Sequence, residues 1–336
     1  MRKATIEKEL LPRKGKTLSG CGRQSGRGGN RIAVSFVGTW LGDRLILEAS
    51  LRLHRRNCPR DYLIAILDKH DAVDFPYAVR RHFDELWLLA GGSGQKWNGR
   101  TWTGSPSTAA GRLVRDALID SKVTELYTAW LPGQVPRNRN YIIRAHNCFV
   151  EGNYLRQWRF YPRLVVPPKD SRWARAYLCS KVNIECDAFI AVHVRSIPRF
   201  SEKNLDPQLI NQIIGWLRTQ KRFAFLLLGR DDVSPGLQGP GIVSFVGEKW
   251  PFDRTAAIIA RTVLFIGGDS SLTHAAAGLG VPIVGLGYTS GLAYPFTNPD
   301  RYIVSGKGES PELIIERVCR FVYPLIGAWD RRKNYG

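Results

Sequence analysis

The segment from Val263 to Thr289, VLFIGGDSSLTHAAAGLGVPIVGLGYT, constrains the fold of this chain more than any other. It contains two short apolar runs, Val263–Ile266 and Pro282–Leu286, of the kind that forms buried strands of a parallel sheet. Between them, Leu272–Leu279 is rich in alanine, which favours a tightly packed helix. The segment therefore predicts a strand–helix–strand unit of an α/β protein.

The start of this helix is a predicted anion site. Asp269 or Ser270 can cap the helix, and Gly280 can end it. A helix N-terminus offers N–H groups and the positive end of a dipole, and in parallel sheets it projects from the edge where phosphorylated ligands bind. We expect a diphosphate-bearing ligand here, held by the backbone N–H groups of Ser271 and Leu272.

The first half of the chain predicts a second unit of the same class. Residues 1–30 are basic and rich in Gly and Ser, and are expected to be a disordered arm. Order is expected from Arg31, in a strand–helix–strand unit. Its parts are a strand at Ile32–Val37, a loop at Gly38–Asp43, a helix at Arg44–Arg56 and a strand at Tyr62–Leu67. A further strand at Leu86–Ala90 and a helix at Ala109–Leu118 follow.

Two domains fit a chain of 336 residues with 44% hydrophobic composition. Trp158–Asp170 carries three prolines and is expected to hold the interdomain connection. We predict Rossmann-like domains at residues 31–165 and 166–325, facing a central cleft, and a tail at residues 326–336. The second domain is expected to have strands at 188–194, 223–228 and 242–245, and helices at 209–219, 255–261 and 311–325, around the opening segment.

The net charge points to anionic partners. Lys and Arg number 49 against 29 Asp and Glu, a formal charge of +20 that attracts nucleic acid, an acidic membrane face or phosphorylated substrates. No apolar run is long enough to span a bilayer, and the N-terminus lacks an apolar signal core. A cytoplasmic protein is expected, with peripheral contact at the inner membrane face left open.

The cysteines do not predict a metal site. They are scattered with no CxxC pair, and the closest two, Cys179 and Cys186, are not spaced like a zinc knuckle. Reduced, structural thiols and no bound metal are expected. The six cysteines are Cys21, Cys58, Cys148, Cys179, Cys186 and Cys319.

Two motifs carry a family resemblance. GGDSSLTHAAAGLGVPIVGLG resembles the nucleotide-binding segment of the ADP-heptose–lipopolysaccharide heptosyltransferases, glycosyltransferase family 9. RIAVSFVGTWLGDRLILEASLRLHRRNCP is similar to the opening strand, Gly-Asp loop and helix of that family. The resemblance implies the GT-B fold and an inverting, metal-independent sugar transfer from a nucleoside-diphosphate donor, with no other cofactor. Ser271 stands where the family usually has glycine. FIAVHVRSIPRF also resembles the His-x-Arg strand end of GT-B fucosyltransferases.

The resemblance implies that Asp43 is the catalytic base. An inverting transferase needs a carboxylate beside the acceptor hydroxyl to take its proton. Gly42, which precedes Asp43, is then expected at the acceptor site. The alternative for Asp43 is a helix N-cap, which needs only an Asp at that place.

The expected diphosphate site comprises Asp269, Ser270, Ser271, Leu272 and His274. His274 lies three to four residues beyond the serines, hence on their face of the helix, where it can donate to the leaving diphosphate. The alternative is that Asp269 caps the helix and His274 is a core residue.

Three cations follow the strand expected at 188–194, namely Arg195, Arg199 and Lys203. Without a metal, fixed cations must stabilise the charge on the departing diphosphate. The resemblance places Lys203 near the family's phosphate-binding lysine, while Arg195 fits the fucosyltransferase pattern. The alternative is that they are ordinary surface cations of a basic chain.

Four further residues are candidates for the ribose and the acceptor. Asp231 and Asp232 follow a predicted strand and can accept hydrogen bonds from ribose hydroxyls, or they form a solvated turn. Trp97 and Trp102 lie in a glycine-rich loop that is either an acceptor lid or an ordinary surface loop.

Other functions remain open. The acceptor is a glycan, a lipid-linked molecule or another hydroxyl compound, and the basic surface suits an anionic one. A nucleic-acid-binding protein would use the same charge, although no specific nucleic-acid module is visible. A GT-B fucosyltransferase, or a nucleotide-sugar epimerase or hydrolase, would keep the fold and change the chemistry.

Overall fold

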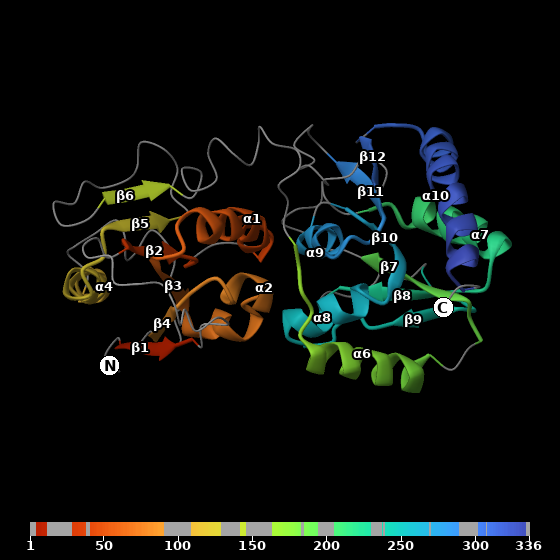
Figure 1. The fold of residues 1–336 in the computed structure, drawn as a ribbon. Helices are drawn as coiled ribbons and strands as arrows, with labels where there is room; N and C mark the ends of the chain where they lie inside the picture. The colour runs from red at the N-terminus through yellow and green to blue at the C-terminus, as the bar shows by residue number, and fades with distance from the viewer. Residues whose placement is uncertain are drawn as a thin grey trace. The chain divides into compact units, whose positions relative to one another are not determined.

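The computed structural model describes residues 5–11, 29–37, 41–90, 109–128, 142–145, 163–182, 185–193, 205–229, 237, 239–268, 270–288, 302–306 and 308–333. The chain divides into two compact units, Met1–Pro162 and Arg163–Gly336. Each unit is a six-stranded, mainly parallel sheet with helices packed on it (Figure 1).

The first unit contains a six-stranded sheet in the order β1-β4-β3-β2-β5-β6. All neighbouring strands are parallel except β1, which is antiparallel to β4. The parallel part has the strand order of a doubly wound fold, and the order reverses between β2 and β5. The strands are β1 (Thr5–Leu10), β2 (Arg31–Ser35), β3 (Tyr62–Asp68), β4 (Glu85–Ala90), β5 (Glu125–Thr128) and β6 (Ile142–Ala145).

Helices cover both faces of this sheet. Helix α1 (Leu41–Asn57) and helix α2 (Tyr77–Arg80) bury apolar side chains against one face, where Leu51 of α1 and Val79 of α2 are fully buried. Helix α4 (Ala109–Asp120) covers the other face and buries Val114 and Leu118. A 3-10 helix, η1 (Lys69–Asp74), follows β3 directly. The result is a three-layer α/β/α unit.

The prediction of a disordered arm over residues 1–30 does not hold for β1. This strand, TIEKEL, pairs in register with β4 from Thr5↔Ala90 to Leu10↔Glu85. Charged side chains of β1 contact neighbouring residues. The Glu7 carboxylate accepts a hydrogen bond from Lys69 Nζ at 2.6 Å, and Lys8 Nζ lies 4.5 Å from the ring centroid of Trp87. Main-chain pairing to a sheet edge and ion pairs hold the strand, so it needs no apolar pattern.

Helix α1 also differs from its prediction. It begins at Leu41, three residues earlier than Arg44, so Gly42 and Asp43 lie in its first turn instead of in a loop. An N-cap residue precedes the first helical residue, so the alternative that Asp43 is the N-cap is wrong.

The second unit contains a fully parallel sheet in the order β12-β11-β10-β7-β8-β9. This is the Rossmann strand order, and it reverses between β7 and β10. The predicted strands are confirmed, and β12 is an addition. The strands are β7 (Ala188–His193), β8 (Phe223–Leu228), β9 (Ile242–Ser244), β10 (Thr262–Gly267), β11 (Ile283–Tyr288) and β12 (Tyr302–Gly306).

In the described part of this unit, helices lie on both sides of the sheet. Helices α7 (Pro207–Gln220) and α10 (Pro311–Lys333) contribute to one apolar core with the strands. Helices α6 (Pro168–Lys181), α8 (Phe252–Ile259) and α9 (Ser271–Leu279) lie on the other side (Figure 1). Helix α6 begins inside the predicted connection because Pro168 occupies its first turn, where a missing N–H costs nothing.

Within the described residues, no helix combines the length and the apolar character that crossing a bilayer requires.

Candidate functional site

The β10–α9 turn lies at the point where the strand order of the second sheet reverses. Strand β10 pairs with β7 at Ile266↔Val192, and α9 begins at Ser271, four residues after β10 ends at Gly267. In open α/β sheets, ligands bind outside the carboxyl ends of the strands at this reversal. The sequence of β10 and α9 therefore positions a helix N-terminus at the expected ligand crevice.

Ser270 is the N-cap of α9. Its backbone is extended, with φ −158° and ψ 164°, and its Oγ accepts a hydrogen bond from the Thr273 N–H at 3.2 Å. Of the two predicted N-cap residues, Asp269 and Ser270, the structure therefore has Ser270 as the cap. Asp269 itself lies outside the described residues.

Thr273, which was not among the predicted site residues, holds the turn from inside. Its side chain is fully buried, and its Oγ1 donates to the backbone carbonyl of Gly268. The Oγ1 atom also lies 3.0 Å from Ser270 Oγ. A signal was present, because a hydroxyl residue three places after a serine cap resembles a capping box.

The first turn of α9 carries the groups that an anion would contact. The N–H groups of Ser271 and Leu272 have no acceptor within the helix, as in the first turn of any α-helix, and they sit at its positive end. Ser271 is helical, so this position does not need glycine for its backbone angles. His274 is half-buried, and its N–H donates to the Ser270 carbonyl at 3.2 Å.

Close packing fixes the two strand ends beside the turn. A Cβ added to Gly267 would lie 2.7 Å from Phe265 Cε1 and 3.1 Å from His193 Cβ. His193 is the last residue of β7 and is buried. Glycine at position 267 therefore lets β10 and β7 end side by side at the strand reversal.

The other end of α9 is equally fixed. Gly280 ends the helix in the left-handed conformation at φ 72°, and its N–H donates to the carbonyls of Ala276 and Ala277. The predicted end at Gly280 is therefore confirmed. The chain entering the second unit packs on this helix, because Leu164 N–H donates to the Gly278 carbonyl at 2.9 Å.

The first unit presents its own carboxyl edge, with Asp43 in the first turn of the helix that follows β2. The side chain of Asp43 is not among those described. The neighbouring Arg44 is buried, and its guanidinium Nη2 lies 2.6 Å from Asp71 Oδ2 in η1. Asp68 ends β3, and its carboxylate accepts from the His70 N–H at 3.0 Å. These contacts anchor the turn that carries Asp43.

The remaining predicted site residues fall outside the described part of the chain, so their placement stays a prediction. They are Trp97, Trp102, Arg195, Arg199, Lys203, Asp231 and Asp232.

The comparison with protein families gives one match. Residues 239–321 match glycosyltransferase family 9 (heptosyltransferase). The matched range includes β10, α9 and β11, which are the segment that first suggested a diphosphate site. No match to a curated protein is found at the sequence level.

Solved structures match over nearly the whole chain. A glycosyl transferase of family 9 from Veillonella parvula is 16% identical, with 90% of this chain and 99% of that chain covered and a TM-score of 0.64. E. coli ADP-heptose lps heptosyltransferase II is 14% identical, with 90% and 99% covered and a TM-score of 0.59. E. coli heptosyltransferase WaaC with ADP-2-deoxy-2-fluoro heptose is 14% identical, with 88% and 99% covered and a TM-score of 0.53.

At these identities the structural likeness establishes the fold. It confirms the predicted α/β class with two Rossmann-like units. The family match confirms the predicted resemblance to glycosyltransferase family 9, and the comparisons together support a glycosyltransferase.

Proposed function

We propose that this protein transfers a sugar from a nucleoside-diphosphate donor to an acceptor hydroxyl, with inversion at the anomeric carbon and no metal in the transfer step. The observation that carries the proposal is the N-terminus of α9 at the strand reversal of the second sheet. Its serine cap and its first-turn N–H groups suit a diphosphate, and its segment is the part that matches family 9.

In this proposal the second unit binds the donor. The N–H groups of Ser271 and Leu272 hold the diphosphate, and His274 donates to it as the bond to the sugar breaks. The cations Arg195, Arg199 and Lys203 are the proposed partners of the negative charge that develops on the leaving nucleoside diphosphate. Asp231 and Asp232 are the proposed contacts of the ribose.

The first unit binds the acceptor. Asp43 takes the proton of the acceptor hydroxyl, and the oxygen attacks the anomeric carbon from the side opposite the departing diphosphate. The Arg44–Asp71 ion pair holds the turn of α1 that carries Asp43, so the base starts from a fixed backbone. Gly42, Trp97 and Trp102 are the proposed acceptor contacts.

An ADP-linked heptose is the first donor to test, because one similar structure is that of an ADP-heptose heptosyltransferase. For the acceptor we propose an anionic glycan or lipid-linked glycan, because a charge of +20 attracts such molecules and the acidic inner face of a membrane. The enzyme would then work in the cytoplasm with peripheral membrane contact.

A thermal-shift series tests the donor half of the proposal. ADP, GDP, UDP and dTDP are each added to the full-length chain, and preferential stabilisation by one identifies the base. ADP is expected to raise the melting temperature most. A response to GDP alone would favour fucosyl-type transfer, and no response to any nucleotide together with tight RNA binding would refute the transferase.

A further inference from the structure

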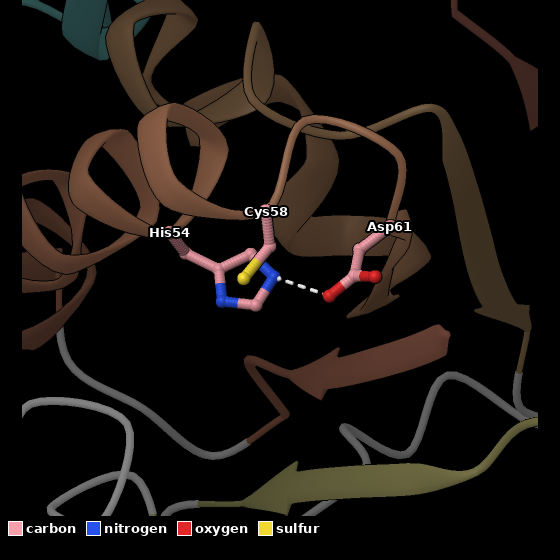
Figure 2. Close-up of side chains that lie close together, drawn as sticks. All are labelled: His54, Cys58 and Asp61. Atoms are coloured by element: carbon pink, nitrogen blue, oxygen red, sulfur yellow. Dashed lines mark hydrogen bonds and ion pairs between the residues drawn. The ribbon is translucent and has the colours of Figure 1, made fainter. Parts of the chain in front are cut away.

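Three side chains at the amino end of the first sheet lie close together. His54 is in the last turn of α1, Cys58 follows that helix, and Asp61 immediately precedes β3. Figure 2 shows the His54 ring, the Cys58 thiol and the Asp61 carboxylate pointing toward one another. A ring nitrogen of His54, Sγ of Cys58 and a carboxylate oxygen of Asp61 all lie within 4.8 Å of one another.

The backbone fixes this convergence. Cys58 N–H donates to the His54 carbonyl at 2.7 Å, which continues the helical pattern and puts both side chains on one face. Asp61 N–H donates to the Cys58 carbonyl at 3.2 Å, and this turn brings the carboxylate back over the helix end. His54 Nε2 and Asp61 Oδ2 are 3.0 Å apart.

The Asp61 carboxylate is held from outside the cluster. Its Oδ1 accepts from the Asn30 N–H at 2.9 Å, and its own backbone carbonyl accepts from Arg55 Nη1 at 2.6 Å. Outer contacts of this kind orient the ligands of metal sites before the ion arrives. Asp61 is buried while Cys58 is exposed, so the cluster is anchored on one side and open to solvent on the other.

We propose that His54, Cys58 and Asp61 form a binding site for a zinc-like divalent cation. An imidazole nitrogen, a thiolate and a carboxylate oxygen are the ligand types of Zn²⁺, at about 2.0–2.3 Å from the ion. Mg²⁺ and Ca²⁺ prefer oxygen ligands alone, so the nitrogen and sulfur disfavour them. Three protein ligands leave the fourth position of a tetrahedral site for water.

Charge and protonation are compatible with this ion. The thiolate and the carboxylate together offset the two positive charges of Zn²⁺. Arg55 brings a positive charge nearby, but its Nη2 is paired with Asp84 Oδ2 at 2.6 Å. Burial lowers the pKa of His54, against the opposing effect of Asp61. On binding, Cys58 releases its thiol proton, and the imidazole proton moves from Nε2 to Nδ1.

This site is separate from the proposed chemistry. His54 lies eleven residues after Asp43 in the same helix, which at about 1.5 Å per residue is roughly 16 Å. A bound ion would instead tie the end of α1 to the start of β3. The prediction of no metal rested on the spacings between cysteines and on the family resemblance, whereas the proposed site combines one cysteine with two other ligand types.

Titration of the tag-free, full-length chain with Co²⁺ and Zn²⁺ tests the site. Co²⁺ bound by Cys58 gives a thiolate-to-cobalt charge-transfer band, and Zn²⁺ should displace it. We expect one ion per chain, a higher melting temperature with Zn²⁺ and protection of Cys58 from a thiol reagent. Cys58→Ser should weaken binding at least tenfold and abolish the band. The matched control is Cys179→Ser, because Cys179 is also exposed but outside any cluster of three potential ligands among the described residues.

Two outcomes would overturn the proposal. One is a Co²⁺ spectrum without the thiolate band. The other is Zn²⁺ affinity that is unchanged in Cys58→Ser, which would make the His54–Asp61 hydrogen bond a contact that closes the turn and nothing more. Asp61→Asn adds a second check, since the amide oxygen can still accept from Asn30 N–H while its metal affinity falls. Binding of nucleotides is measured in parallel and is expected to be unchanged in each variant.

Discussion

Replacing Thr273 by valine removes the side-chain hydroxyl while keeping nearly the same side-chain shape, so it tests the contribution of the hydroxyl alone. The side chain is fully buried, and its Oγ1 donates to the Gly268 carbonyl and contacts Ser270 Oγ at 3.0 Å. Valine fills nearly the same space but leaves the buried Gly268 carbonyl without this donor, a loss of about 1–3 kcal/mol. In a unit of this size, about 2 kcal/mol corresponds to a fall in melting temperature of roughly 4–8 °C.

The same change should weaken nucleotide binding. Thr273 holds the turn that positions the first N–H groups of α9. Without its hydroxyl this turn is less ordered, and ADP binding must supply the free energy that orders it again. If that ordering costs about 1.4 kcal/mol, the affinity for ADP falls about tenfold. Calorimetric titration of ADP into Thr273→Val and Thr273→Ser measures this. Serine keeps the hydroxyl and should bind ADP as the wild type does; equal ADP affinity in the valine variant would refute the reasoning.

Other changes test the remaining parts of the account. Asp43→Asn should abolish sugar transfer while ADP binding persists; if ADP affinity collapses too, the residue is structural. Gly267→Ala should lower the melting temperature and weaken ADP binding, because the alanine methyl group would clash with Phe265 and His193. Normal ADP affinity would show that the ends of β10 and β7 can separate without affecting the nucleotide site. Arg44→Gln should reduce the free energy of unfolding by about 1–3 kcal/mol, because the Asp71 ion pair is lost. The turn that carries Asp43 is then less fixed, so kcat should fall while the KM for the acceptor changes less. An unchanged kcat would contradict this positioning role.

Elements with a strong local pattern could be predicted from the sequence. The fully buried strand β8 was predicted at its observed bounds, since six apolar residues in a row have no other stable place in an α/β unit. The strand–helix–strand unit around α9 was predicted for the same reason, together with the end of the helix at Gly280. The sequence left Asp269 and Ser270 as possible N-caps of α9, and the hydrogen bond from the Thr273 N–H to Ser270 Oγ identifies Ser270 as the cap.

Elements that depend on distant partners could not be predicted. Strand β1 is charged and largely exposed, and only pairing with β4 some eighty residues away makes it a strand. Helix α6 begins with prolines that also suit a connection, so packing against α8 is what decides its structure. The cluster at the end of α1 was missed because the imidazole and the carboxylate approach Cys58 through a turn that no cysteine spacing reveals.

Amide hydrogen exchange with and without ADP reports on the N–H groups of α9 themselves, and so shows whether they bind the diphosphate. We expect ADP to slow exchange in the segment from Gly268 to His274 far more than in the buried strand β8, and Thr273→Val to reduce this protection. Binding of ADP that leaves exchange at Ser271 and Leu272 unchanged, or no binding of any nucleoside diphosphate, would contradict it.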